Sequence, residues 1–304
     1  PVTGFDLSDI TVTGTASGGS PAASNFAGTG PYTFDVVTTG DGTVIVSVPA
    51  NSATDGLNQN TASNTFTLTV DSSAPSVAIT SAGNTSGDTV NTTTISYTAT
   101  FSEPVTGFDL SDITVTGTAS GGSPAASNFA GTGPYTFDVV TTGDGTVIVS
   151  VPANSATDGL NQNTASNTFT LTVDSSAPSV AITSAGNTSG DTVNTTTISY
   201  TATFSEPVTG FDLSDITVTG TASGGSPAAS NFAGTGPYTF DVVTTGDGTV
   251  IVSVPANSAT DGLNQNTASN TFTLTVDSSA PSVAITSAGN TSGDTVNTTT
   301  ISYT

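Results

Sequence analysis

The sequence contains no lysine, arginine, histidine, cysteine, methionine or tryptophan in its 304 residues. Because 23 acidic residues face no basic one, the formal net charge is −23. Such a chain repels polyanions, and it offers no basic patch that could release counterions from a nucleic acid. Nucleic-acid binding is therefore excluded.

The absence of histidine and cysteine removes whole classes of chemistry. No imidazole or thiolate is available as a catalytic base, as a nucleophile, or as a ligand for zinc, copper, haem or iron–sulfur clusters. Disulfides and Lys–Asn isopeptide cross-links are excluded as well, which suits a bacterial exported protein that needs no redox chemistry. Hard cations with oxygen ligands remain the only metals to consider, and any catalysis would depend on Asp, Glu, Tyr and Ser.

Long apolar runs and basic leaders are also missing. No apolar run approaches the roughly 20 residues that span a bilayer, and no basic segment precedes a hydrophobic stretch. The sequence therefore predicts neither a membrane segment nor a signal peptide within these residues.

Trypsin has no cleavage site here, because it requires lysine or arginine. We expect overnight incubation with trypsin to leave the chain intact on a denaturing gel. Defined tryptic fragments from this region would show that the sequence is wrong.

A long internal repeat organises the chain. Residues 1–103 recur without a difference as residues 104–206, and a third copy runs from Pro207 to Thr304. A period of 103 residues matches an independent domain and exceeds the roughly 20 to 50 residues of a solenoid repeat. Placing boundaries in V-D-S-S-A-P, after Ala74, Ala177 and Ala280, gives a partial repeat (1–74), two complete repeats (75–177 and 178–280) and a second partial repeat (281–304).

Alternating apolar and polar residues predict strands and no helix. The segment T-I-S-Y-T-A-T-F places Ile95, Tyr97, Ala99 and Phe101 on one face. G-D-G predicts a hairpin turn, and the glycine-rich G-T-G-P and S-G-G-S segments are predicted as turns because no phosphate-loop lysine follows. For residues 75–177 we predict strands A to G near 76–81, 93–101, 108–117, 126–130, 134–141, 146–151 and 165–173. Seven strands at this spacing predict an all-β, immunoglobulin-like sandwich in each complete repeat.

Three phrases carry a family resemblance over the entire chain. F-S-E-P-V-T-G-F-D-L-S-D-I-T-V-T-G, N-S-A-T-D-G-L-N-Q-N-T-A-S and L-T-V-D-S-S-A-P resemble the bacterial immunoglobulin-like (Big-type) repeats of giant surface adhesins, biofilm-associated proteins and extracellular fibres. The resemblance implies tandem sandwiches, an extracellular or bacterial cell-surface location, and Ca²⁺ at some inter-domain linkers.

Carboxylates are predicted to converge where one repeat follows another. Because successive strands of a sandwich run in opposite directions, the N-terminus, the B–C loop and the F–G loop share one end. Such a cluster, with amide neighbours such as Asn161, offers the oxygens that Ca²⁺ prefers, six to eight at about 2.3–2.6 Å. The predicted ligands are Asp71, Glu103 and Asp158, with Asp109 reaching the same space, and their copies Asp174, Glu206, Asp261 and Asp212.

Plainer readings of the same residues stay open. The acids can be solvated loop residues, and Asp6 with Asp9 in D-L-S-D can cap a turn. Rows of alternating threonines are typical of outward strand faces, so ice binding is the weaker interpretation. The sequons at Asn84 and Asn91 are accounted for by the abundance of Asn and Thr.

The sequence favours a structural function over binding or catalysis. We predict a non-catalytic repeat region of a long extracellular adhesin or filament, acting as a rod-like spacer of identical beads. The alternative is a repeated glycan- or protein-binding module, which would expose an aromatic platform; Tyr32, Phe34, Phe66 and Phe101 are instead predicted to face inward. A glycosidase would need an enclosed pair of carboxyl groups, which a bead with short loops does not offer.

The partial repeats predict a self-partner. Residues 1–74 carry strands C to G, and residues 281–304 carry strands A and B, so neither can bury its core alone. We expect the end of the chain to complete a bead with the start of a further copy. Continuity of one longer polypeptide, favoured because Thr304 stops in mid-strand, and strand donation between subunits both remain open.

Overall fold

The computed structural model describes residues 1–16, 22–119, 125–222 and 228–304. It divides into two compact units, Pro1–Ser175 and Ser176–Thr304. The S-G-G-S segments, predicted as turns, lie outside the described residues. Within the described residues, no helix has the length and apolar character needed to cross a membrane.

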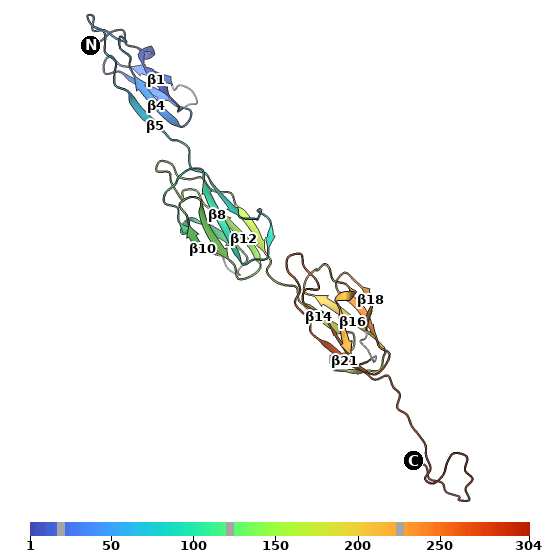
Figure 1. Ribbon diagram of the computed structural model, residues 1–304. Coiled ribbons are helices and arrows are strands. Elements are labelled where there is room, and N and C mark those ends of the chain that lie inside the picture. The colour runs from blue at the N-terminus through green and yellow to red at the C-terminus, as the bar shows by residue number, and fades with distance from the viewer. Residues whose placement is uncertain (17–21, 120–124, 223–227) are drawn as a thin grey trace. The chain divides into compact units, whose positions relative to one another are not determined.

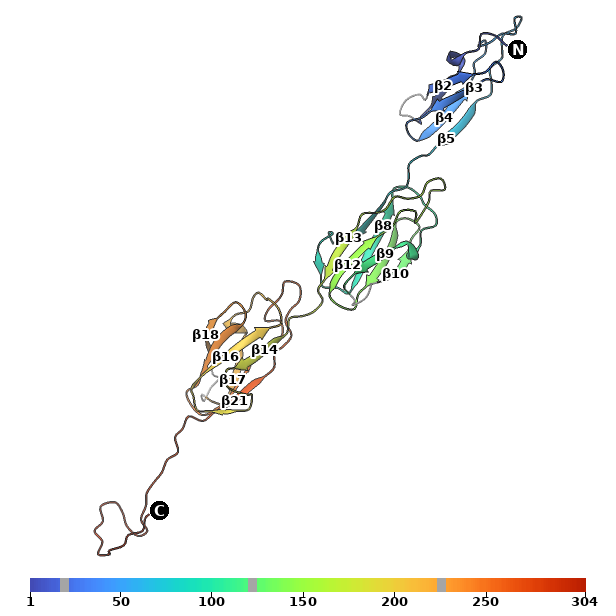
Figure 2. The same ribbon diagram turned by 180° about the vertical axis from the view of Figure 1, so that it is seen from behind.

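The first complete repeat is formed by two four-stranded sheets that lie face to face (Figures 1 and 2). One sheet has the order β10, β11, β8, β6 (Ala125–Ala130, Tyr135–Val140, Thr94–Phe101, Val77–Ser81) and is antiparallel throughout. The other has the order β7, β13, β12, β9 (Thr89–Val90, Phe169–Val173, Gly145–Ser150, Thr114–Gly117), with β7 parallel to β13. In immunoglobulin notation these are the sheets D-E-B-A and A′-G-F-C. The predicted all-β sandwich is confirmed.

The second complete repeat has the same two sheets. Their orders are β14, β16, β19, β18 (Val180–Ser184, Thr197–Phe204, Tyr238–Val243, Ala228–Ala233) and β15, β21, β20, β17 (Thr192–Val193, Phe272–Val276, Gly248–Ser253, Thr217–Gly220). Since the two repeats have the same sequence, each serves as an internal reference for the other.

The core of each complete repeat lies between its two sheets. On β8 the predicted alternation is confirmed: Ile95, Tyr97 and Ala99 are buried, while Phe101 at the strand end is partly buried. The Tyr97 ring stacks on Phe137 of its own sheet, with ring centroids 5.6 Å apart. It meets Phe169 of the facing sheet edge-on, at 5.8 Å. Aromatic contacts therefore join the sheets across the core.

The structure differs from the prediction at the start of strand C. Residues 108–113 do not extend β9. Leu110–Asp112 among them form a single 3₁₀ turn, η2, so the prediction of no helix is wrong here. Asp109 accepts a hydrogen bond from the Ser111 backbone N–H at 2.7 Å, and the Asp109 N–H donates to the Asp112 carboxylate at 2.8 Å. This reciprocal cap stabilises the turn, as it does in its copies η1 (Leu7–Asp9) and η3 (Leu213–Asp215).

Strand G begins later than predicted, at Phe169. Before it, the Asn167 side chain bonds to both backbone groups of Ile79, accepting from the N–H at 2.8 Å and donating to the carbonyl at 3.0 Å. The Asn167 side chain therefore makes the two backbone hydrogen bonds to β6 that a neighbouring strand would otherwise make. The short strand β7, which was not predicted, pairs with the end of β13 through Thr89 and Val90.

The partial repeats lack one another's strands. Residues 1–74 form the sheets β1, β4, β5 (Thr11–Gly14, Gly42–Ser47, Phe66–Val70) and β2, β3 (Ala22–Ala27, Thr33–Val37), while residues 281–304 form no strand (Figure 1). Phe66 is 62% exposed, whereas its copies Phe169 and Phe272 are 6% exposed. Phe66 pairs with Val46 as Phe169 pairs with Val149, so it lies on the predicted inward face, but no strands of a facing sheet cover it.

Candidate metal centre

A two-residue bridge holds the B–C loop against the F–G loop in the first complete repeat. The Thr106 N–H donates to the Thr157 carbonyl at 2.8 Å, and the Thr157 N–H donates back at 3.1 Å. Glu103 lies three residues before this bridge on one side, and Asp158 directly follows it on the other. The bridge therefore sets the two carboxylates side by side.

A buried asparagine shapes the loop that carries Asp158. Asn163, 2% exposed, accepts a hydrogen bond from the Ala156 N–H at 2.7 Å. Its amide group donates to the carbonyls of Pro152 at 3.0 Å and Thr164 at 2.8 Å. These bonds replace the water that the three backbone groups would otherwise need, so the loop has a defined shape.

The linker brings a third carboxylate to the pair. The side chains of Asp71, Glu103 and Asp158 each place an oxygen within 4.8 Å of the others, and all three residues are half-buried. The Asn161 amide group spans the group, donating to the Asp71 carbonyl and to the Asp158 carboxylate, both at 3.3 Å. The structure therefore brings together three of the predicted ligands and the predicted amide neighbour, Asn161, at one end of the sandwich.

The second predicted set is divided between the two units. Asp174 belongs to the first unit, and Glu206 and Asp261 belong to the second. Within the second unit, Asp261 accepts hydrogen bonds from the N–H groups of Leu263 at 2.7 Å and Asn264 at 2.8 Å, as Asp158 does from Leu160 and Asn161. The local geometry of the loop is therefore repeated.

Asp109 and Asp212, also predicted as ligands, have a different role. Neither belongs to a cluster of close carboxylates in the described residues. Each caps its 3₁₀ turn, and the hydrogen bonds from the side chain and backbone of the serine two residues on lower the pKa of the carboxyl group. Because the described carboxylates that lie close together do not include Asp109 or Asp212, we remove both from the ligand set.

No positively charged side chain balances the negative charge of the three carboxylates. Partial burial raises the pKa of Glu103, and the charges of Asp71, Asp158 and Asp41 raise it further. Hydrogen bonds from the backbone of Asn161 and Leu160 lower the pKa of Asp158, which therefore stays anionic. No lysine or arginine exists in the chain to offset these charges. A bound divalent cation would do so.

Asp41 is a site residue that the sequence analysis missed. It lies in the hairpin turn between β3 and β4 and accepts hydrogen bonds from the N–H and the hydroxyl of Ser72, both at 2.7 Å. The equivalent pair Asp144 and Ser175 has the same bonds at 2.7 and 2.8 Å. The sequence around Asp41 predicts only a turn. Nothing in that sequence indicates that the carboxylate contacts Ser72 of the linker, 31 residues further along the chain.

Comparisons with known proteins give no family. No family model matches the chain, and no curated protein matches it. Among solved structures, it is similar to the Escherichia coli adhesin FdeC (21% identity, 90% of this chain and 87% of that chain, TM-score 0.40). It is also similar to a marsupial T cell receptor (10% identity, 70% of this chain and 76% of that chain, TM-score 0.27). A further similar structure is that of domains 4–9 of the surface layer protein SbsC (13% identity, 93% of this chain and 41% of that chain, TM-score 0.20). With TM-scores this low, the fold assignment depends on the strand order alone.

Proposed function

We propose that this chain is a structural, non-catalytic repeat region of an extracellular or bacterial cell-surface protein, in which identical sandwiches act as spacers. The observation that supports this is the duplication of a complete, self-contained core. In both complete repeats the tyrosine and two phenylalanines at the centre of the core, Tyr97, Phe137 and Phe169 in the first, have the same exposures of 1%, 1% and 6%. Duplicated beads that hide their aromatic side chains add length and expose little that recognises a ligand.

The carboxylates do not favour catalysis. A raised pKa at Glu103 beside other acids is also found in glycosidases, where one carboxyl group acts as a general acid. Glycosidase carboxyl groups, however, are separated by about 5–5.5 Å or 6.5–9.5 Å, so that a sugar or a water fits between them. The oxygens of Asp71, Glu103 and Asp158 lie within 4.8 Å of one another, which is the spacing of groups that share one cation.

If the repeats act as spacers, the maximum dimension of the molecule should increase with the number of complete repeats. Chains carrying two, three and four complete repeats are compared by small-angle X-ray scattering. We expect the maximum dimension to increase by a constant amount for each added repeat. A dimension that does not grow would contradict the spacer. Binding to a glycan array that strengthens with repeat number would favour the alternative adhesive module.

We further propose that Ca²⁺ binds at Asp71, Glu103 and Asp158 and stiffens the linker. The linker contributes Asp71 and the repeat contributes the other two, so removing the ion frees the linker but leaves the core of the repeat intact. We expect a chelator to change the scattering profile and to leave the far-UV circular dichroism of the strands unchanged. Identical profiles with and without chelator would contradict a role for Ca²⁺ in stiffness.

Calorimetric titration tests the ligand assignment. Glu103→Gln should reduce the Ca²⁺ bound, whereas Asp88→Asn, an acid outside the cluster, should not. The pH dependence has a defined sign: because the pKa of Glu103 is raised, protons compete for this carboxylate, and affinity should fall as the pH drops through that raised pKa. Equal binding by the two variants would make these acids ordinary solvated residues.

A further inference from the structure

The first and last segments of each complete repeat lie side by side and run in the same direction. In the first complete repeat these are the first segment, residues 75–90, and the last segment, residues 164–174. The Thr164 N–H donates to the Pro75 carbonyl at one end, and the Asp174 N–H donates to the Val90 carbonyl at the other, both at 2.9 Å. The chain therefore enters and leaves the repeat at opposite ends of this pairing (Figures 1 and 2).

Two side chains join the middle of the two segments. Asn167 of the last segment bonds to both backbone groups of Ile79, at 2.8 and 3.0 Å. Further along, the Ser86 hydroxyl accepts a hydrogen bond from the Thr170 N–H at 3.0 Å. Ile79 lies on β6, which also pairs with β8. The strand that enters the repeat is therefore bonded on both sides.

Backbone pairing continues the contact to the exit of the repeat. The Gly87 N–H donates to the Thr170 carbonyl at 2.7 Å, and the Thr172 N–H donates to the Asp88 carbonyl at 3.0 Å. From there β7 pairs in parallel with β13. The same bonds are present in the second complete repeat: Thr267 with Pro178, Asn270 with Ile182, Thr273 with Ser189 and Gly190, Thr275 with Asp191, and Asp277 with Val193.

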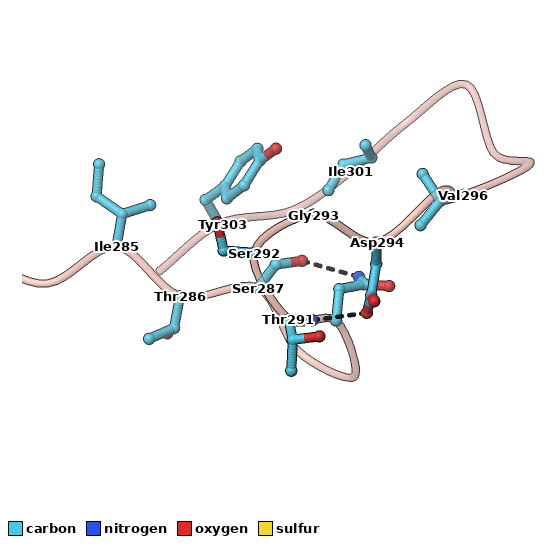
Figure 3. Close-up of a pocket in the computed structure, with 11 residues that line it drawn as sticks. Ile285, Thr286, Ser287, Thr291, Ser292, Gly293, Asp294, Val296, Ile301 and Tyr303 are labelled. Carbon is cyan, nitrogen blue, oxygen red and sulfur yellow. Dashed lines mark hydrogen bonds between the residues drawn. The ribbon is translucent and has the colours of Figure 1, made fainter.

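A copy of the first segment without a last segment beside it is found within residues 281–304. These residues form no strand, and Figure 3 shows Ile285 and Val296, the copies of Ile79 and Val90, among them. The strands β6 and β7 are therefore maintained by their partners within the complete repeat.

Tension on the chain acts along the pairing of the two segments. A force that separates the ends of a repeat pulls the first segment one way and the last segment the other, parallel to their length. The bonds between them are then loaded together, so several must break at once before the segments slide. If the segments were pulled apart from one end, the same bonds would break in succession. Because forced unfolding is governed by the unfolding rate, the first geometry should withstand force for longer.

We propose that each complete repeat bears tension along the chain, and that the pairing of its first and last segments is the contact that resists the force. This function goes beyond that of the spacer, because a spacer requires only length. It requires no cation, since hydrogen bonds within one repeat make the contact.

Single-molecule stretching of the 304-residue chain at constant force, with a chelator present, tests the geometry. The chain has no cysteine, so two introduced cysteines define the points of attachment. Ala74→Cys with Ser176→Cys, the sliding pair, loads the bonds together. Thr92→Cys with Ser176→Cys, the peeling pair, opens the contact from its Val90 end. All of these attachment positions are exposed.

At equal force, the first complete repeat should unfold at least about 10-fold more slowly through the sliding pair than through the peeling pair. This is the factor expected when one further hydrogen bond must break in the same step. Equal lifetimes, or a longer lifetime with the peeling pair, would overturn the proposal.

A matched pair of variants tests the residues of the contact. Asn167→Ala removes the two bonds to Ile79. Ser96→Ala removes a bond to the Asp138 carboxylate between β8 and β11, which belong to neither segment. With the sliding pair, Asn167→Ala should shorten the lifetime at least about 10-fold, and Ser96→Ala should leave it nearly unchanged.

The peeling pair separates a mechanical role of Asn167 from ordinary stabilisation. Its bonds lie far from the Val90 end and break late in that geometry, so Asn167→Ala should then have little effect on the lifetime. An equal effect with both pairs would make Asn167 a stabilising residue only and would contradict the proposal. None of these outcomes alters the growth of maximum dimension with repeat number, which tests the spacer function separately.

Discussion

Replacing Gly117 with alanine should destabilise the first complete repeat by about 3–5 kcal/mol, because this position combines two steric conflicts. Its φ is +136°, a conformation that side chains with a Cβ rarely adopt. A Cβ built there would lie 2.0 Å from the carbonyl oxygen of Thr146 and 2.7 Å from its carbon.

The neighbouring strand cannot move away from that Cβ without loss. The Thr146 carbonyl accepts hydrogen bonds from the N–H groups of Thr118 at 2.9 Å and Ala119 at 3.1 Å. Moving it would break both bonds beside Ala119, whose side chain is 0% exposed. The alanine Cβ would therefore clash with backbone atoms of Thr146 that are held in place, and no flexible side chain can move aside to relieve the clash.

Scanning calorimetry measures this effect against a reference within the same molecule. Gly117→Ala changes the first complete repeat only, so the transition of the unaltered second repeat should stay in place while that of the first moves to lower temperature. Gly107→Ala is the control, since Gly107 has φ +86° but no atom within 4 Å of its Cβ position. It should cost only about 1–2 kcal/mol. Equal shifts for the two variants would show that the close approach to Thr146 does not matter.

The fold was largely predictable because each strand carries its own signal. Ile95, Tyr97 and Ala99 alternate with polar residues, and such alternation requires a half-buried strand wherever it occurs. The errors fall where side chains replace backbone pairing. Asp109 caps a 3₁₀ turn within a predicted strand, and Asn167 bonds to Ile79 where strand G was predicted to begin. Both contacts depend on side-chain geometry that hydrophobic periodicity does not encode.

The candidate site was predictable only as far as topology determines it. Glu103 and Asp158 come together because alternate strands of a sandwich return their loops to the same end, and sequence order alone specifies this. The placement of Asp41 could not be deduced in the same way. Its contact with Ser72 joins a hairpin turn to a linker, and neither segment has a pattern that identifies the other.

Replacing Asn163 with alanine should cost about 3 kcal/mol of stability and also weaken Ca²⁺ binding, although the residue is not among the proposed ligands. Its carboxamide, 2% exposed, bonds to the backbone of Ala156, Pro152 and Thr164. Removing it leaves the buried Ala156 N–H without a partner, at about 1–3 kcal/mol, and adds the loss of two part-buried hydrogen bonds and of the packing of a buried side chain. The Ala156 N–H lies two residues before Asp158, so the loop that positions this carboxylate loses its support.

Two measurements on one variant separate the structural effect from the effect at the site. Denaturant unfolding should show the first complete repeat destabilised and the second, with its intact Asn266, unchanged. Calcium titration under native conditions should show weaker binding, because folded molecules still contain Asp158 but in a loosened loop. Gln162→Ala, an exposed neighbour, should change neither quantity. If Asn163→Ala loses stability yet binds Ca²⁺ as the wild type does, Asn163 supports the fold alone and the loop geometry around Asp158 is maintained by the Thr106–Thr157 bridge.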